Sequence, residues 1–432
     1  MDVDGTVLAM GELDTFKCHG NSTMQPDKKP FKIKLSKKES LLGMNKLSRW
    51  ILLANQYDQT AIRNTVCLKL AAAAGLPYTP QCRAVDLYIN GNYRGNYLLC
   101  EKIEIGKNML PITDLEKATE EANDAPLDSY PYVKGSSKDL GLEGGTFTVG
   151  KTFSNKRSLP GWKAMKGGDW TAREIPNDPE DITGGYLLQA GTKYDGDTTA
   201  HFVTSSSGWR IFFRSPKEAS VAQVRYVLTL LEKLDRAIDR KDYAALTQII
   251  DVDEWASRYI FEEFTGNYDG GTGSFYMYKD VDSVDPLLHC GPVWDYDTAL
   301  GAKTAVSNAS AILLGYADTA FVKFDFNPLY RLTQIPEFME RVKAIYAETY
   351  RPLIRVLLGE ETSADGSLLS IREESAAISA SYAMNYTRWS YEMHKRFVNP
   401  GFTEQAGLDY LVDWVEKRMA YLDSVWLSTE EK

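Results

Sequence analysis

The apolar residues of this chain change their spacing along the sequence, and the change limits the folds that the chain can adopt. Near the N-terminus, Phe31, Ile33 and Leu35 alternate with Lys32 and Lys34, which is the period-two pattern of a half-buried strand. In the second half the spacing becomes helical. Two stripes carry it: Val221, Val224, Leu228, Leu231, Leu234 and Ile238, and later Leu408, Leu411, Val415, Met419 and Leu422. The sequence therefore predicts an α+β fold that is β-rich first and mostly helical afterwards.

The first hundred residues also contain signals for one helix and one hairpin. An Ala- and Leu-rich stretch from Ala61 to Ala74 ends at Gly75, which is a common helix stop signal. Further on, two β-prone runs flank Asn90-Gly91. Asn-Gly between two such runs indicates a tight β-hairpin.

A chain of 432 residues exceeds one ordinary core, so we expect two lobes. Residues 1–104 would form a small antiparallel-β N-lobe with one main helix, and residues 105–432 a larger, mostly helical C-lobe. Residues 116–181 are rich in Gly, Ser, Asp, Glu and Pro and indicate a long loop insertion. We predict that this insertion borders the cleft between the lobes as a lid, since ligands prefer such clefts. The alternative is a solvated insertion without a role.

Composition argues against several classes of function. The net charge is −10 and no long basic run is present, which argues against sustained nucleic-acid binding. No stretch approaches the roughly 20 apolar residues of a transmembrane span, and no segment has the order of a signal peptide. The five cysteines and four histidines are scattered, without a C-x-x-C pair. This pattern argues against a zinc site and favours buried free thiols.

The strongest chemical motif is Trp294-Asp295-Tyr296-Asp297, where an apolar run ends in two acids at positions i and i+2. In an extended segment both side chains would point the same way, about 7 Å apart. Two carboxylates on one face can bind Mg²⁺ or Mn²⁺, which prefer oxygen ligands. The alternative is a pair of solvated acids at the end of a strand.

A second motif follows a predicted helix that ends near Thr265. Asp269 lies there in a Gly-rich loop, where a carboxylate beside a metal site can accept a proton from a hydroxyl. Asn267 could supply another oxygen ligand to the metal. The same residues also suit a helix C-cap followed by a turn.

A third motif is the turn Gly20-Asn21-Ser22-Thr23, which precedes the Lys-rich strand. Small residues let backbone N–H groups approach phosphate oxygens, and Lys32 and Lys34 could neutralise those phosphates. Ordinary turn chemistry explains the same residues. A phosphate turn, a strand lysine, a helix, a loop aspartate and a metal-type aspartate follow one another in protein kinases. The H-R-D and D-F-G sequences are absent, so a kinase built from these parts would be atypical.

Several short segments, taken together, point to one family. They are Gly20-Asn21-Ser22-Thr23, Lys28 to Leu35, Leu41 to Met44, Trp50 to Asn55 with Asp58, Arg63 and Asn64, Val85 to Gly91, Tyr97-Leu98-Leu99 with Glu101, Gly184 to Leu188, Arg214-Ser215-Pro216, Tyr276 to Asp280 and Trp294-Asp295-Tyr296-Asp297. In this order they resemble the CotH kinase family, whose founding member is a spore-coat protein. The resemblance runs from about Cys18 to Gly301 and is weaker in the helical remainder.

The resemblance implies an atypical, secretory-type kinase that uses ATP and Mg²⁺ or Mn²⁺ to phosphorylate Ser or Thr hydroxyls of a protein, and it allows autophosphorylation. It also implies an extracellular, cell-surface or spore-coat location. By position, Asp269 resembles the catalytic carboxylate and Asp295 the principal metal ligand, with Asp297 and Asn267 in support. The nucleotide-binding residues expected on this basis are Asn21, Ser22, Thr23, Lys32, Lys34 and Glu101. Lys34 is the first choice for the phosphate contact and Lys32 the alternative, because their alternation places both on one face.

The sequence also departs from the family pattern. His19 stands where the family usually has Arg, and Gln189 where an acid is common. The predicted helix from Ala61 to Ala74 contains no Glu, so Asp58 or Glu101 would have to replace the usual partner of the strand lysine. These departures motivate a second hypothesis, a surface or structural binding module that lacks turnover. A third, a carboxylate hydrolase acting on sugars, would use the same acids but leaves the Lys-rich strand unexplained.

Overall fold

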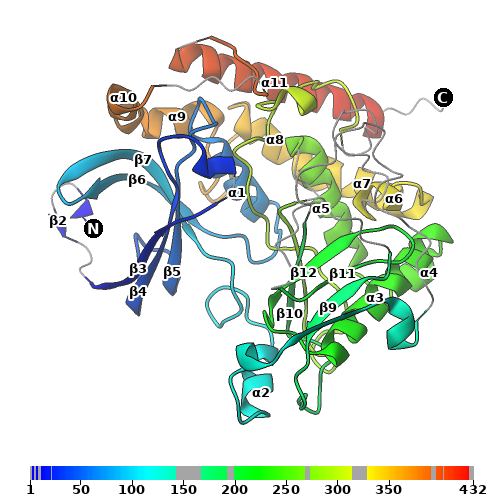
Figure 1. Cartoon of the computed structure of the whole chain (residues 1–432). Coiled ribbons are helices and arrows are strands. Elements are labelled where there is room, and N and C mark those ends of the chain that lie inside the picture. Colours follow the sequence, from blue (N-terminus) through cyan, green and yellow to red (C-terminus); the bar gives the residue numbers. More distant parts are fainter. Residues whose placement is uncertain are drawn as a thin grey trace.

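The computed structural model describes residues 11–20, 22–142, 167–191, 199–267, 273–313, 328–390, 396–401 and 403–427. It also describes the backbone of two short paired strands, β1 (Asp2–Val3) and β2 (Thr6–Val7). The fold is a mixed α+β arrangement of two larger antiparallel sheets and several helices (Figure 1).

The first sheet, called the N-terminal sheet below, has five strands in the order β3-β4-β5-β7-β6. Its strands are β3 (Leu13–Cys18), β4 (Phe31–Ser40), β5 (Lys46–Leu53), β6 (Cys82–Ile89) and β7 (Asn92–Glu101). The predicted hairpin is confirmed, because β6 and β7 are joined at Asn90 and Gly91, whose φ angles are 51° and 77°. Such left-handed values suit Asn and Gly at a two-residue hairpin turn.

The predicted helix of this region is also confirmed, as α1 (Arg63–Ala73). It begins slightly later than expected because Ala61 has a φ of 59°, which is not helical. Buried Asp58 sets the start: Oδ2 accepts the backbone N–H of Arg63 at 2.7 Å. At the other end, Gly75 has a φ of 77° and ends the helix.

The second sheet has six strands in the order β13-β10-β12-β11-β9-β8. They are β8 (Tyr132–Gly135), β9 (Trp170–Arg173), β10 (Tyr186–Ala190), β11 (His201–Val203), β12 (Arg210–Ser215) and β13 (Phe275–Lys279). The interpretation of residues 116–181 as a loop insertion was wrong where β8 and β9 lie. Both strands have four residues, and Trp170, Thr171 and Ala172 are all buried, so no alternation marks β9.

Helices fill the rest of the described chain. They are α2 (Leu115–Glu121), α3 (Val221–Asp239), α4 (Tyr243–Leu246), α5 (Val252–Thr265), α6 (Pro328–Leu332), α7 (Pro336–Ile345), α8 (Arg351–Leu357), α9 (Ile371–Ala377), α10 (Ser379–Arg388) and α11 (Glu404–Trp426). Short helical turns are η1 (Ser22–Met24), η2 (Leu127–Ser129), η3 (Ser137–Leu140), η4 (Thr304–Val306) and η6 (Tyr346–Tyr350). Both predicted apolar stripes are confirmed, in α3 and α11.

The C-terminal helices reach back to the N-terminal sheet. Figure 1 shows α11 along the top of the molecule and α10 near β7. The backbone N–H of Asn96 in β7 donates to Asn385 Oδ1 of α10 at 3.1 Å. Among the helices of the described residues, none is long and apolar enough to cross a membrane.

Candidate active site

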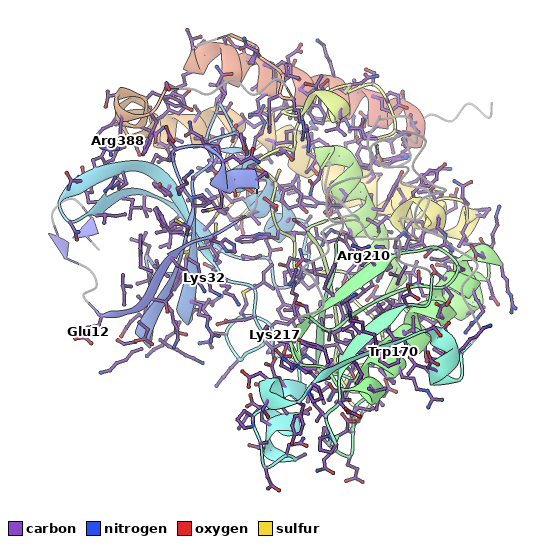
Figure 2. All side chains as sticks on the ribbon, in the orientation of Figure 1. Glu12, Lys32, Trp170, Arg210, Lys217 and Arg388 are labelled. Carbon is purple, nitrogen blue, oxygen red and sulfur yellow. The ribbon has the colours of Figure 1, made fainter. Side chains whose placement is uncertain are left out.

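A cavity of about 910 Å³ is lined by residues of both sheets. This volume lies within the roughly 300–1,000 Å³ usual for sites that bind small molecules or cofactors. Arg49 and Ile51 of β5 line it from the N-terminal sheet, and Gln189 of β10 from the second sheet. Figure 2 shows Lys32 and Arg210 on the two sheets. Helix α1 and the loops add polar groups: His19, Ser22, Thr23, Asn64, Lys102, Glu104, Ser274, Asp295 and Asp297.

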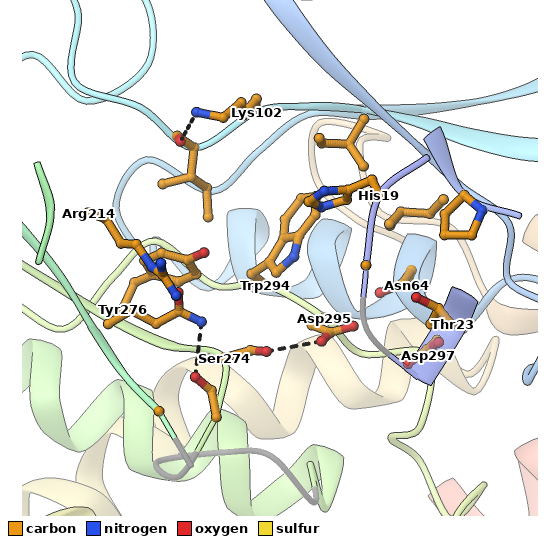
Figure 3. A pocket seen from close by; sticks show the side chains of 18 of the residues that line it. His19, Thr23, Asn64, Lys102, Arg214, Ser274, Tyr276, Trp294, Asp295 and Asp297 are labelled. Atoms are coloured by element: carbon orange, nitrogen blue, oxygen red, sulfur yellow. Dashed lines mark hydrogen bonds between the residues drawn. The ribbon is translucent and has the colours of Figure 1, made fainter. Parts of the chain in front are cut away.

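Asp295 and Asp297 both line this cavity, but not through the geometry expected from their spacing. Residues 291–296 form no strand, and Asp295 has a φ of 74°, in the left-handed region. The strand interpretation of the motif is therefore wrong, and a loop brings the two acids to the cavity. Ser274 Oγ donates to Asp295 Oδ2 at 3.0 Å (Figure 3).

Tyr296, between the two acids, is held from two sides. Its backbone N–H donates to Asn64 Oδ1 at 2.8 Å, and its hydroxyl donates to Glu262 Oε1 at 2.5 Å. Arg258 Nε donates to the same Glu262 oxygen at 2.8 Å. Burial raises the pKa of Tyr296, and the charge of Glu262 raises it further, so the phenol stays a proton donor. The backbone that carries Asp295 and Asp297 is thus anchored in the core.

The small-residue turn also reaches the cavity, through Ser22 and Thr23. Gly20 has a φ of 103°, and a Cβ at this position would come within 2.2 Å of Thr23 Oγ1. Only glycine therefore lets the chain fold so closely over Thr23. Asn21, the third expected phosphate contact in this turn, lies outside the described residues. In Figure 3, Thr23, Asn64 and Asp297 gather at one end of the cavity, Arg214 and Tyr276 lie toward the other, and Trp294 stands between.

Lys32 and Lys34 share a face of β4, as their alternation predicts. Lys32 is paired with Ile51 and Lys34 with Arg49, and paired residues of antiparallel strands point to the same side. Ile51 and Arg49 line the cavity, but neither lysine is among the described residues that do so. Lys34 Nζ lies 3.0 Å from Asp14 Oδ2, with the two side chains 40% and 42% exposed. Lys34 is therefore engaged with Asp14, and the choice between Lys34 and Lys32 as the phosphate contact stays a prediction.

Lys32 belongs to a group of cations that we call the cation cluster: Lys32, Arg49 and Lys102. Of these three, Arg49 and Lys102 line the cavity. Burial lowers the pKa of Lys32, and the charges of Lys102 and Arg49 lower it further. Glu104 offsets part of this repulsion, since Arg49 lies 2.9 Å and Lys102 3.3 Å from Glu104 Oε2. Burial also lowers the pKa of His19, as do Lys32 and Lys102, so the ring is neutral at pH 7. Mutually repelling cations beside a cavity form a region that attracts an anion.

Glu101 and Asp58 are held by other groups of the protein. Glu101 is fully buried, and its two carboxylate oxygens accept the backbone N–H groups of Asn45 at 2.8 Å and Gln81 at 2.9 Å. Asp58 is ion-paired with Arg63. Neither acid is among the described residues that line the cavity. A nucleotide-binding role for Glu101 stays a prediction that the geometry does not support.

The loop of the expected catalytic acid is described only at its two ends. Asp269 lies outside the described residues. Asn267 is buried, is not among the described residues of the cavity wall, and donates its backbone N–H to Glu262 O at 3.4 Å. On the far side of the loop, Gln189 Nε2 donates to Gly273 O at 3.0 Å, while Gln189 Oε1 accepts from Arg214 Nε at 2.6 Å. Gln189 thus fixes Gly273, the first described residue after residues 268–272.

The first residues of the predicted insertion, 116–181, line the cavity. Glu116, Lys117 and Glu120 of α2 are cavity residues. Glu116 Oε2 accepts the backbone N–H of Lys217 at 3.0 Å. Residues 143–166, in the middle of the insertion, lie outside the described residues. The insertion therefore borders the cavity in part, and its action as a lid stays a prediction.

A separate group of acids surrounds His289, outside the described cavity wall. Asp251, Glu254 and His289 place possible ligand atoms within 4.8 Å of one another. His289 Nδ1 lies 2.7 Å from Glu254 Oε2, and Nε2 lies 2.8 Å from Asp285 Oδ2. Burial lowers the pKa of His289, but hydrogen bonds to and charges of Glu254 and Asp285 outweigh burial and raise it. Both nitrogens can then donate, so the geometry is that of an ion-paired histidine.

The sequence motifs missed several cavity residues that the fold supplies. Arg49 and Lys102 carry no local signal of a phosphate site, because a cation on a strand or just after one is ordinary surface chemistry. Asn64 is marked only by the family resemblance. Ser274 follows the Gly-rich loop and could have been suspected from that place alone. The cysteines were predicted to be buried thiols. This holds for Cys67, Cys82, Cys100 and Cys290, whereas Cys18 is exposed.

These features define a mixed α+β protein with a cavity that combines paired acids, a small-residue turn and cations. Residues 16–139 and 171–422 match the family model described as CotH kinase protein. The chain belongs to the CotH kinase family. No curated protein matches the chain significantly.

Proposed function

We propose that this protein is an atypical protein kinase that transfers the γ-phosphate of ATP to Ser or Thr hydroxyls of a protein. One observation carries the proposal: Thr23 of the small-residue turn, Lys102 of the cation cluster and the acid Asp295 line the same cavity. A small-residue turn and cations complement phosphates, and paired acids complement the metal that accompanies them. Membership of the CotH kinase family supports the same class of reaction.

The donor groups of the cavity fit Mg²⁺ or Mn²⁺. Asp295 and Asp297 supply carboxylates, and the Thr23 hydroxyl lies at the same end of the cavity (Figure 3). Hard divalent cations prefer such all-oxygen sets. Asp295 would be the principal ligand and Asp297 the supporting one, whereas Asn267 is a ligand only if it leaves its buried place. A bound ion would neutralise and orient the phosphates of ATP.

Asp269 is the proposed catalytic base. It would accept the proton of the acceptor hydroxyl while that oxygen bonds to the γ-phosphorus and the bond to the β-phosphate oxygen breaks, releasing ADP. The residues on either side of Asp269 that the structure describes, Asn267 and Gly273, are held by hydrogen bonds, which supports this role. Gln189 holds Gly273 on one side, and the backbone of Asn267 follows directly from α5 on the other.

We further propose that the chain has an N-lobe of residues 1–104 and a C-lobe of residues 105–432, with the cavity between them. Thr23 and Lys102 would then come from the first lobe, and Gln189 and Asp295 from the second. The cavity residues of α2 support a lid in the insertion of residues 116–181. We place the enzyme and its protein substrate outside the cell, at a cell surface or in a spore coat. The enzyme itself is one candidate phosphate acceptor.

Transfer of label from γ-labelled ATP tests the proposal. Wild-type protein should incorporate label in the presence of Mg²⁺ or Mn²⁺ and lose this activity with a chelator. Asp295→Ala and Asp269→Ala should each abolish incorporation. Asp413→Asn is the matched control, because Asp413 is 52% exposed and pairs with Lys417 on the surface of α11. Incorporation that persists unchanged in both cavity variants contradicts the proposal.

The alternative function, a binding module without turnover, is favoured by one observation. Lys34, the first choice for the phosphate contact, is paired with Asp14 instead. A module that has lost nucleotide binding would show no rise in melting temperature with ATP and Mg²⁺. A module that keeps nucleotide but lacks turnover would show the rise without any transfer of label.

A further inference from the structure

Two cysteines of the N-terminal sheet lie directly opposite each other. Cys82 of β6 is paired with Cys100 of β7 in the antiparallel register. The backbone N–H of Glu101 donates to Gln81 O at 3.1 Å, so the neighbouring pair is a hydrogen-bonded one. Because the two kinds of pair alternate, Cys82 and Cys100 form a non-hydrogen-bonded pair, in which Cα atoms are about 4.5 Å apart. Disulfides join Cα atoms about 4.4–6.8 Å apart, so this pair falls within their range.

The two thiols also point the same way into the core. Cys82 is 4% exposed and Cys100 0% exposed, and both belong to the buried cluster that includes residues of α1. Cys67 of α1 lies in the same cluster, but it is not a partner in the β-ladder.

We propose that Cys82 and Cys100 form a disulfide when the protein folds in an oxidising medium. The oxidant is a small disulfide such as oxidised glutathione. The thiolate of one cysteine bonds to a glutathione sulfur and breaks the glutathione S–S bond, which releases one reduced glutathione. The second cysteine thiolate then bonds to the first cysteine sulfur and releases the second. Two protein thiols lose two electrons and two protons in total, and the oxidant gains them.

The burial of the pair decides when this bond forms. Burial raises the pKa of the Cys100 thiol, and the neighbouring Cys82 raises it further. Because the thiolate is the attacking species, exchange in the finished fold is slow. The bond therefore forms while the hairpin is still open to solvent, and the closed core afterwards shields it from reductants.

The position of the bond relates it to the cavity wall. Cys100 is paired with Ile51 of β5 on its other side, and Ile51 lines the cavity. Cys100 is also followed two residues later by Lys102 of the cation cluster. The disulfide would join β6 to β7 on the same face of the sheet as Ile51, beside this wall, and would limit separation of the two strands. The inference does not depend on the proposed kinase activity.

Peptide mapping tests the disulfide. Denatured, reduced protein is refolded in a mixture of reduced and oxidised glutathione, denatured again, alkylated with iodoacetamide and digested with trypsin. Arg83 and Arg94 separate the two cysteines, so their peptides stay together only if they are linked. The expected product joins residues 70–83 to residues 95–102, with Cys18, Cys67 and Cys290 alkylated.

Matched variants and a thermal readout complete the test. Cys67→Ser should keep the linked peptides, whereas Cys82→Ser should lose them and leave its four cysteines alkylated. Oxidised wild-type protein should melt at a higher temperature than the reduced form, with no such difference in Cys82→Ser. Alkylation of all five cysteines after oxidative refolding overturns the proposal, and so does a link between Cys100 and Cys67. The wild-type map alone decides if Cys82→Ser fails to fold.

Discussion

The side-chain oxygen of Asn64 accepts the backbone N–H of Tyr296 at 2.8 Å, across 232 positions of sequence. Asn64 lies on α1, and Tyr296 stands between Asp295 and Asp297. The amide nitrogen of Asn64 donates in turn to Asn55 Oδ1 at 3.0 Å. Helix α1 is thus connected to the loop that carries Asp295 and Asp297 by buried hydrogen bonds. The position of α1 therefore affects the position of these two acids.

Asn64→Ala should weaken metal binding in the cavity. The change leaves the buried N–H of Tyr296 unpaired, at a cost of about 1–3 kcal/mol. We expect the affinity for Mn²⁺ in the presence of ATP to fall by about tenfold, which corresponds to ~1.4 kcal/mol. Electron paramagnetic resonance of free Mn²⁺ measures this affinity. Asn108→Ala is the control, since the Asn108 side chain makes an exposed contact with Lys46 O. Equal affinities in the two variants would argue against a role for the Asn64 contact.

Tyr296→Phe should destabilise the fold. The change removes the hydroxyl that donates to fully buried Glu262 and leaves Arg258 as its charged partner. Loss of one buried charge-assisted hydrogen bond should lower the free energy of unfolding by about 1.5–3 kcal/mol. Urea denaturation measures the change. Tyr88→Phe is the control, because Tyr88 is 56% exposed. A loss below about 0.5 kcal/mol, as for ordinary surface substitutions, would contradict the prediction.

Much of the fold could be predicted from sequence because its main elements have strong periodic signals. The alternation around Ile33, the Asn90-Gly91 turn and the apolar stripe of α3 all correspond to observed elements. Strands β8 and β9 could not be found this way. Four residues are too few to establish a period, and Trp170, Thr171 and Ala172 are buried without alternation.

The candidate site was predictable only in its acids. Asp295 and Asp297 stand out because they end an apolar run. Their left-handed loop could not be foreseen, since it depends on contacts of Asn64 and Ser274 that come from distant parts of the chain. Alternation likewise could not separate Lys32 from Lys34. Only the fold reveals the ion pair between Lys34 and Asp14.

Gln189→Leu should impair the proposed phosphoryl transfer more than ATP binding. Leucine can neither donate to Gly273 O nor accept from Arg214 Nε. Gly273, the first described residue after residues 268–272, would lose one anchor. We expect kcat to fall by about tenfold, the equivalent of one lost hydrogen bond of ~1.4 kcal/mol, with a smaller change in KM for ATP. Steady-state transfer of labelled phosphate measures both quantities. Gln405→Leu on α11 is the control, because the Gln405 side chain makes an exposed contact with Asp409. A change confined to KM would contradict the prediction.

The ion-paired histidine should make stability depend on pH. Burial opposes the charge of His289, but Glu254 and Asp285 raise its pKa above the usual value of about 6.5. A group whose pKa is raised by folding contributes stability that is fully present below the unfolded pKa. That contribution is lost as pH rises through the folded pKa. Wild-type protein should therefore lose stability relative to His289→Gln as pH rises above about 6.5.

Thermal melting of both proteins across this pH range measures the His289 contribution as a difference. The difference is needed because buried Lys28, whose pKa burial lowers to about 7, contributes with the opposite sign. Lys28 is present in both proteins, so its effect cancels. A stability difference between wild type and His289→Gln that stays constant, or grows with pH, would contradict the assignment.

Calorimetric titration with ATP tests most directly whether Asp295 holds the metal that brings the nucleotide phosphates into the cavity. Wild-type protein should bind ATP with measurable heat in Mg²⁺ or Mn²⁺ and lose binding with a chelator. Asp295→Ala should lose the metal-dependent part of the affinity, while Asp413→Asn keeps it. Equal, metal-dependent binding by wild type and Asp295→Ala would contradict the central assignment.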